Sequence, residues 1–570
     1  MHPTHFCKLI IFGALTMLMA SCSKTNTQGK LIPKEAALVM QLDGKSLTSK
    51  LPWDEIKRNA LFQEMKNDST LPATLKNLLD NPDNAGIDTK NDLLFFVVKD
   101  SLGGYIGFEG KVKDPAVFKT FNQQITEKGV ESEIGDAQFI SKSPVCVGWT
   151  NEHFVYIFDM PQISRMDELS RRMIRDSIDI SSTRKPRDIG AACKAIFALK
   201  ESNSLAKNEK FTSLMKAAGD VRFWMNSEEL NKGASSSAAL AMLNMEKFYK
   251  GNVTAGTLNF ENGKILMNAT TYASEDMINL FKKYSGGKIS EDMIKRMPGK
   301  DVVGIMALNF KPEAIRDLIK MTGLDGLINM GVQKLGFTMD DFIKANKGDI
   351  LIGLSDLVVK PDTSMFKFKD QDEHFSISQK PSFNFIFAAS IGDKDAFNKI
   401  VNAGKALGGQ MGDSSKMPIA YKSNGTYFAL SNNQQNVDQY LGTASNNFDF
   451  ISKISGEPFG GYLDIQTILK AFGTQATKDS AAKIAYDASL KMWDNVLWKG
   501  GNYSNEGMQQ TVEINLVDKS TNSLKQLNQY SAMLSELYRE QKRKQREEMM
   551  AFQEFESTDT TQPSPPVKTK

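Results

Sequence analysis

Apolar and polar positions follow an order along this chain that occurs twice. Ala36–Asp43 (AALVMQLD) and Val302–Asn309 (VVGIMALN) are strand-like apolar runs that end in Asp or Asn just before a helical pattern. Lys113–Phe118 (KDPAVF) and Gly392–Phe397 (GDKDAF) each follow two strand-like runs and begin an amphipathic helix. Two further pairs keep the same order, namely 208–226 with 447–464 and 259–284 with 502–530. Four ordered matches predict two homologous halves.

Each half is predicted to mix antiparallel strands with helices. The last pair of matches contains alternating hairpins around Glu261–Gly263 and Asn505–Gly507, whose residue types favour tight turns. Strands are joined by both hairpins and helices, without a long regular series of parallel units, so the predicted class is α+β. Because 570 residues exceed the size at which single cores usually divide, we expect two tandem domains, over residues 31–286 and 293–530.

Three segments lie outside this repeat. Met166–Ser204 is a charged, helical insertion in the first half, and Lys360–Lys380 is a polar loop in the second half. Ser523–Phe555 has the pattern of one long C-terminal helix, of which residues 531–556 contain a run of charges. That run fits either a solvated helix end or a partner-binding segment. Residues 557–570 are rich in Thr, Pro and Lys, and we expect them to be disordered.

The first residues have the layout of a secretory signal peptide. A weakly basic start precedes the apolar run Leu9–Ala20, and small residues precede Cys22. The run is too short to span a bilayer as a helix, since a span needs roughly 20 residues. Residues 1–21 are therefore predicted to be removed, and residues 22–30 to form a polar tether. An ordinary cleaved signal with a coincidental cysteine is the alternative.

The residues around Cys22 resemble the lipobox of bacterial lipoproteins, which implies lipid on this cysteine and attachment to a membrane. Several acyl chains would hold the protein there, because each buried methylene contributes about 0.8 kcal/mol. Ser23 stands where an Asp would resemble an inner-membrane retention signal, and residues 23–27 lack an acidic cluster. These features favour an outer-membrane anchor that faces the periplasm.

Composition excludes some classes of function. The 70 basic and 67 acidic residues give a formal net charge of +3, so no global basic field favours nucleic acid as a partner. Apart from Cys22, only Cys146 and Cys193 remain after cleavage. They could form one disulfide in an oxidising envelope or stay as buried free thiols. A zinc or iron–sulfur site built from cysteines is excluded by their number.

No pattern of reactive residues predicts a catalytic site, a metal or a cofactor. His153 and His374 are the only histidines beyond the signal, they lie in different halves, and His153 fits a turn between strands. No Gly-x-Ser-x-Gly elbow or phosphate-binding loop occurs. Ser-x-x-Lys spacings such as Ser213 to Lys216 lack the accompanying motifs of penicillin-recognising enzymes, and Leu214 and Met215 there fit the inward face of a helix.

Polar residues at strand and helix ends have a structural interpretation. Thr338 and Asp341 have the spacing of a helix capping box. Four further residues end strand-like runs before helices and fit either helix caps or a repeated ligand rim: Asp43, Asn226, Asn309 and Asp464. The acidic loop with Asp362, Asp370, Asp372, Glu373 and His374 fits a solvated loop better than a calcium site, because it lacks EF-hand spacing.

Two segments that follow the lipobox resemble the domain-of-unknown-function 4836 family of Bacteroidetes-type envelope lipoproteins. They are IPKEAALVMQLD and NEKFTSLMKAAGDVRFWMN, and both belong to the duplicated part of the chain. The resemblance spans about residues 31 to 530. Its motifs are strand and helix patterns, so it implies an address and a fold and brings no catalytic residues.

Three functions fit these observations. A lipid-anchored envelope protein that binds a ligand or a protein partner needs no reactive constellation and is the leading hypothesis. A glycan hydrolase could use carboxylates that leave no motif, and it would place two buried carboxyl groups about 5 to 10 Å apart in a groove. An assembly factor would act through the C-terminal helix. Five tryptophans could line a carbohydrate site but fit the core better: Trp53, Trp149, Trp224, Trp493 and Trp498.

Overall fold

The computed structural model describes most of the chain beyond its first residues. The described ranges are 29–67, 73–160, 187–232, 246–366, 374–410, 419–443, 446–476, 480–504 and 506–535, with a few single positions up to residue 547. The predicted signal peptide and Cys22 lie outside these ranges, as do residues 367–373 of the polar loop and residues 161–186 of the charged insertion.

Eighteen strands of the described residues form one continuous antiparallel sheet. From one edge to the other, their order is β4 (Val130–Ile134), β5 (Ala137–Lys142), β6 (Val145–Trp149), β7 (His153–Asp159), β3 (Tyr105–Lys111), β2 (Leu93–Val98), β1 (Ala36–Leu42), β8 (Val221–Asn226), β9 (Val253–Glu261), β10 (Lys264–Tyr272), β18 (Gly507–Leu516), β17 (Trp493–Ser504), β16 (Phe459–Asp464), β11 (Val302–Asn309), β12 (Asn346–Phe366), β13 (His374–Ile391), β15 (Tyr427–Ser431) and β14 (Ala420–Ser423).

The strand order repeats on the two sides of the sheet. The series β6-β7-β3-β2-β1-β8-β9-β10 has the same succession of pairings as β14-β15-β13-β12-β11-β16-β17-β18. The two series meet where β10 pairs with β18, from Lys264 opposite Asn515 to Thr271 opposite Met508. We call this pairing the seam. It joins residues 31–286 to residues 293–530 within one sheet.

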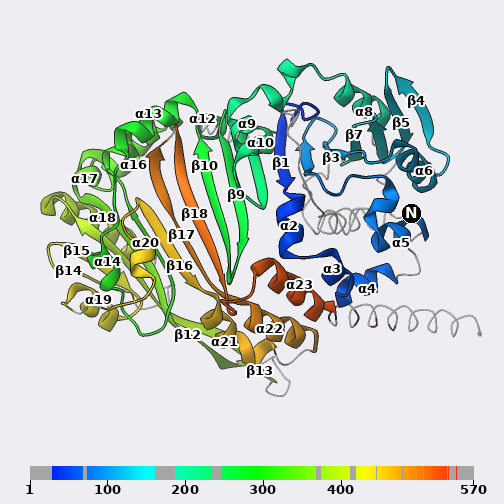
Figure 1. The fold of residues 1–570 in the computed structure, drawn as a ribbon. Helices are drawn as coiled ribbons and strands as arrows, with labels where there is room; N and C mark the ends of the chain where they lie inside the picture. Colours follow the sequence, from blue (N-terminus) through cyan, green and yellow to red (C-terminus); the bar gives the residue numbers. More distant parts are fainter. Residues whose placement is uncertain are drawn as a thin grey trace, which may run out of the picture.

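Helices lie on both faces and at the ends of the sheet (Figure 1). They are α2 (Gly44–Lys50), α3 (Trp53–Lys57), α4 (Ala60–Lys66), α5 (Ala73–Asp80), α6 (Pro115–Ile125), α8 (Ile189–Phe197), α9 (Glu209–Lys216), α10 (Ser227–Asn231), α12 (Glu246–Tyr249), α13 (Glu275–Tyr284), α14 (Glu291–Lys295), α15 (Glu313–Thr322), α16 (Asp325–Lys334), α17 (Met339–Lys344), α18 (Lys394–Gln410), α19 (Gln434–Leu441), α20 (Ile451–Ile454), α21 (Ile465–Ala476), α22 (Ser480–Met492) and α23 (Ser523–Met533). Short 3-10 turns are η1 (Pro82–Ala85), η3 (Glu201–Asn203) and η4 (Leu205–Lys207). The helices and the antiparallel sheet confirm the α+β class.

Both faces of the sheet are packed in the first half. Successive side chains of a strand point to opposite faces, and accordingly Leu94 and Phe96 of β2 enter one core cluster while Leu93 enters another. The first cluster includes residues of α8 and α9, and the second includes residues of α6. Burial of each such large side chain contributes about 1.5–3 kcal/mol. The sheet is therefore the central layer of this half and lies between two apolar cores.

The predicted turns of the two hairpins beside the seam are confirmed. Glu261 pairs with Lys264 across a turn in which Gly263 has φ of +69°. Ser504 pairs with Gly507, and Glu506 in that turn has φ of +65°. A positive φ is a left-handed conformation that suits glycine and is uncommon for a residue with a side chain. Glu506 is thus held in the tight turn between β17 and β18. The ends of the two strands that this turn joins are the upper ones in Figure 1.

The predicted loop from Lys360 to Lys380 is wrong over most of its length. β12 continues to Phe366 and β13 starts at His374, and Lys360 pairs with Lys380. Strand pairing therefore overrides the polar composition that suggested a loop, because antiparallel strands can form their ladder with polar side chains on both faces. The remaining candidate calcium ligands, Asp370, Asp372 and Glu373, lie outside the described residues.

The C-terminal helix is described as a continuous element only from Ser523 to Met533. Contacts with α3 and with the residue before α4 hold this helix in place. Asn59 Nδ2 donates a hydrogen bond to the Asn528 carbonyl at 2.6 Å, and Lys525 forms an ion pair with Glu55 at 3.1 Å. In Figure 1, α23 lies beside α22 below the seam strands. The charged stretch 531–556 lies largely outside the described residues, so its length as a helix stays a prediction.

Candidate functional site

A pocket of about 570 Å³ lies beside the seam, and we call it the seam pocket. Its lining comes from η4, the first turns of α9, strands β8 to β10 and the turn between β17 and β18, so both series of strands contribute. The lining residues are Lys207, Asn208, Glu209, Lys210, Ser213, Trp224, Gly251, Val253, Tyr272 and Glu506. This volume is within the usual range for small-molecule sites.

Helix α9 positions one wall of the seam pocket. Asn208 caps the helix, because its side-chain oxygen accepts a hydrogen bond from the Phe211 amide at 3.0 Å. Phe211, Leu214 and Met215 are buried on the inner face, which confirms that this Ser-x-x-Lys segment packs inward. Ser213 is exposed and lines the pocket, whereas Lys216 does not line it.

Trp224 forms part of the pocket's inner wall from strand β8. Its ring packs edge-to-face on Phe211, with ring centroids 5.5 Å apart. The residue is only 2% exposed, and its indole Nε1–H has no hydrogen-bond partner in the described structure. A buried donor without an acceptor costs roughly 1–3 kcal/mol. The core assignment of Trp224 is therefore confirmed, and its Nε1–H is an unsatisfied donor of the core.

Charged groups of both signs line the same pocket. The Lys210 Nζ lies 4.3 Å from the centroid of the Tyr272 ring, a cation–π arrangement that fixes the ammonium over β10. Lys207 is paired with Glu201 at 3.1 Å. Glu209 and Glu506 line the pocket from α9 and from the β17–β18 turn. The site can therefore hold a ligand with complementary charges.

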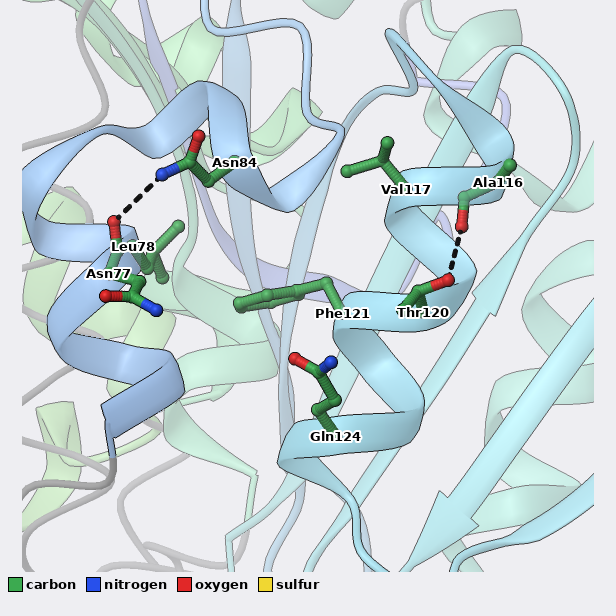
Figure 2. A pocket seen from close by; sticks show the side chains of 8 residues that line it. All are labelled: Asn77, Leu78, Asn84, Ala116, Val117, Thr120, Phe121 and Gln124. Carbon is green, nitrogen blue, oxygen red and sulfur yellow. Dashed lines mark hydrogen bonds between the residues drawn. The ribbon is translucent and has the colours of Figure 1, made fainter.

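A second, uncharged groove lies between α5 and α6 and has a volume of about 450 Å³ (Figure 2). Figure 2 shows Phe121 pointing from α6 toward α5 across the groove, and this side chain is largely buried. On the rim, the Thr120 hydroxyl donates to the Ala116 carbonyl at 3.0 Å, so part of its hydrogen-bonding capacity is already used. The eight lining residues are Asn77, Leu78, Asn84, Ala116, Val117, Thr120, Phe121 and Gln124. None of these side chains is ionisable, so the groove offers shape without charge.

Buried and partly buried carboxylates cluster where β1 ends and where β2 and β8 begin. They do not line either pocket. Asp220 accepts hydrogen bonds from Ser46 Oγ at 2.5 Å, Lys50 Nζ at 2.6 Å and the Phe260 amide at 2.6 Å. Burial, followed by the nearby Asp43 charge, raises the pKa of Asp92, whose Oδ2 accepts a hydrogen bond from Gln41 Nε2 at 2.6 Å. These contacts tie α2 to the sheet, so they give the carboxylates a structural role.

Three of the four strand-end residues are helix caps, as predicted. Asp43 accepts from the Ser46 amide, Asn226 from two amides of α10, and Asp464 from the Thr467 amide. The predicted cap at Asn309 is wrong: its Nδ2 donates to Asp349 Oδ1 at 2.5 Å. Its helix α15 starts only at Glu313, so Asn309 is too far from the first turn. The capping box of Thr338 and Asp341 is confirmed.

The remaining sequence candidates stay apart from the seam pocket. His153 begins β7 opposite Lys111, and burial, followed by the Lys111 charge, lowers its pKa. Cys146 and Cys193 are buried free thiols in the first core cluster. Among the described residues, no group of acidic, histidine or cysteine side chains is arranged to hold a metal ion. In the same part of the chain, every helix is too short or too polar to cross a bilayer.

Sequence reasoning missed the seam pocket because its residues are far apart along the chain. Lys210, Tyr272 and Glu506 are brought together by β8, β9, β10 and β18, and no local spacing marks them. The nearest signal was the repeated hairpin, which located the turn containing Glu506. Nothing in the residue pattern indicated that Trp224 would lack an acceptor.

Glu109 on β3 provides a test of the buried electrostatics. Burial raises its pKa from 4.5 to about 8, and its Oε2 has no partner in the described structure. Between these two values the unfolded chain loses the proton while the folded protein keeps it, so stability falls as pH rises. Glu109→Gln should remove most of this decline and be more stable than wild type at pH 8, by on the order of a few kcal/mol. Urea unfolding from pH 5 to 8 measures it.

Glu133→Gln, on an exposed position of β4, is the matched control, because it removes a carboxyl group without changing a buried site. It should keep the wild-type dependence on pH. Equal slopes for wild type and Glu109→Gln would show that Glu109 is not the buried acid described above.

Comparisons with known proteins identify a family but no function. Structures of TP0453 in crystal forms III and IV are 10% identical to this chain, with TM-scores of 0.23. They cover 43% and 46% of this chain and 79% and 87% of their own. TM-scores this low carry no argument about the fold. No curated protein matches the chain.

A family model, described as domain of unknown function DUF4836, matches residues 29–413. This match covers more than half of the sequence, and the chain therefore belongs to the DUF4836 family.

Proposed function

We propose that this protein is a lipid-anchored component of the cell envelope that binds a ligand in the seam pocket without transforming it. The observation that carries the binding role is the seam pocket itself, a space of about 570 Å³ in which Glu209, Lys210 and Glu506 form no ion pair with the described residues. A space of this size with a few charged groups on its wall is typical of small-molecule sites.

The proposed architecture is a duplicated domain whose two copies share one sheet. The repeated succession of pairings on the two sides of the seam supports this reading. Gene duplication would make the pocket a product of the junction, because neither copy alone supplies both Tyr272 and Glu506. The domains would span residues 31–286 and 293–530.

The proposed location rests on the amino-terminal sequence. The apolar run Leu9–Ala20 and the small residues before Cys22 favour export, cleavage and lipid attachment. Ser23 favours the outer membrane, with the body facing the periplasm. Residues 22–30 would then tether the sheet to the membrane.

The described residues favour this role over a glycan hydrolase. A hydrolase would need paired buried carboxyl groups in a groove. The two carboxylates that line the seam pocket, Glu209 and Glu506, are exposed, and Asp43, Asp92 and Asp220 line neither pocket.

An assembly factor would act through the C-terminal helix, and its charged residues 531–556 lie largely outside the described residues. The described part, α23, contacts α4, and Asn59 donates a hydrogen bond to Asn528. This alternative therefore stays open.

Cys22→Ala tests the anchor. The wild-type protein should carry the added mass of acyl chains and sediment with membranes, because more than one chain gives stable attachment. The variant should lose both properties and keep the same fold. Intact-protein mass spectrometry together with membrane fractionation measures this, and lipid-free wild-type protein would contradict the proposal.

Ser213→Trp tests the pocket. Ser213 is exposed on α9 and lines the pocket, so an indole there should fill the space without disturbing the core. Native mass spectrometry of protein purified gently from cells should show a small non-covalent adduct in the wild type that this variant lacks. Lys216→Trp adds the same ring to the same helix outside the pocket and should retain the adduct. Identical spectra for all three proteins would exclude a ligand in the seam pocket.

A further inference from the structure

We infer that one face of the sheet binds the hydrocarbon chain of a lipid, along two rows of apolar side chains that cross eight adjacent strands. The strand register, the exposure of these side chains and their chemistry support this role. The site is separate from the seam pocket. Met267 in the rows and Tyr272 in the pocket are an odd number of residues apart on β10, so their side chains point to opposite faces of the sheet.

The rows follow from the register of the strands. Directly paired residues of neighbouring strands place their side chains on the same face, so the pairings trace each row from β9 to β13. Figure 1 shows β9, β10, β18, β17 and β16 side by side in this order. The first row is Leu258, Met267, Val512, Trp498, Gly461, Met306, Ile352 and Phe387, and the second, two residues away on each strand, is Phe260, Ile265, Ile514, Val496, Leu463, Gly304, Leu354 and Phe385. We call these the apolar rows.

Part of the apolar rows is open to solvent. Met306 and Ile352 are each 41% exposed and Leu354 is 38% exposed, although α21 contacts β11, β12 and β17. The opposite face of the same strands is closed, because Ile305 and Leu351 belong to a buried core cluster. Large apolar side chains that stay exposed next to one another are typical of a binding surface.

The area of the apolar rows is too small for a stable dimer. Eight strands about 4.8 Å apart give a length of roughly 34 Å, and two rows about 6.8 Å apart give a width of roughly 13 Å. The resulting area is roughly 450 Å². A stable protein interface buries about 800 Å² on each partner. A second copy of the chain would therefore gain too little area at this face.

The chemistry of the apolar rows favours hydrocarbon over protein. None of their residues carries a charge, and the Trp498 indole is their only side-chain N–H or O–H group. Protein interfaces have about one hydrogen bond per 100–200 Å², which these side chains do not supply. Each of these strands is already paired on both sides, so an extended peptide has no free strand edge to join here. An acyl chain needs neither kind of hydrogen bond.

Trp498 provides a reporter within the apolar rows. Its ring lies over Gly461, where an added Cβ would be 2.1 Å from the ring atom Cζ2. The experiment uses the full chain with Cys22→Ala as the parent protein, which has no lipid of its own on that residue. Stearate with a nitroxide on its chain should quench the fluorescence of Trp498 in a saturable way. Trp498→Phe identifies the part of the signal that belongs to this residue.

Unlabelled fatty acids show which part of the ligand is recognised. Each methylene removed from stearate should weaken its competition by about fourfold, because the shorter chain buries less apolar surface. Equal competition by stearate and the shorter myristate would show that the carboxylate is recognised, and this result would overturn the inference. The series needs no substitution in the apolar rows, so it stays decisive if a variant fails to fold.

Ile352→Glu places a charge in the first row. It should weaken stearate binding at least roughly tenfold, because a carboxylate covered by hydrocarbon loses its hydration. Ile352 is 41% exposed, so water can reach the new charge in the free protein and the fold should persist. Leu327→Glu is the matched control, because Leu327 is 65% exposed on α16, outside the apolar rows. The control should bind stearate as the parent does.

The outcomes separate hydrocarbon from other occupants and from the seam pocket. If nitroxide stearate leaves Trp498 unquenched, or if Ile352→Glu binds as tightly as the parent, the inference is wrong. If sedimentation shows a dimer of the parent that Ile352→Glu alone disrupts, a second copy occupies the rows and the inference is again wrong. Ser213→Trp changes the other face of the sheet and should keep the stearate affinity, so the rows and the seam pocket can fail separately.

Discussion

The ladder between β10 and β18 is the interaction on which the rest of the structure depends. Eight consecutive residue pairs, from Lys264 with Asn515 to Thr271 with Met508, connect the two series of strands. Without them, each series would end in a long edge strand with unpaired amides and carbonyls, which is a template for aggregation. Side chains also cross the seam: Lys264 pairs with Glu513 at 3.0 Å, and the Thr270 hydroxyl donates to Gln509 Oε1 at 2.9 Å.

The seam also creates the proposed binding site. Tyr272 stands at the end of β10, and Glu506 lies in the turn that precedes β18, so the ladder fixes both relative to α9. Lys210 of α9 is placed over the Tyr272 ring, so the ladder and the helix are in direct contact at the pocket. Such preorganisation lowers the cost of ordering side chains when a ligand binds. In this account, the binding role arises from the junction of two similar halves rather than from either half.

The sequence allowed prediction of the elements that depend on local chemistry. The turns at Gly263 and Gly507, the capping box at Thr338 and the caps at Asp43 and Asp464 all follow from residues close together in the chain. Long-range pairing could not be predicted in the same way. The ladder that extends β12 and β13 into the polar segment 360–380, and the contact of Asn309 with Asp349, depend on which strand lies alongside. The seam pocket was missed for this reason.

The central claim is that β10 and β18 hold the chain together as one cooperative sheet. Hydrogen exchange read by mass spectrometry tests it directly, because slow exchange reports amides that open only in large-scale unfolding. The account predicts that seam amides such as those of Met267 and Val512 exchange as slowly as those of the inner strands β1 and β11. Rapid exchange at the seam, with β1 and β11 still protected, would show two units that move independently and would contradict the account.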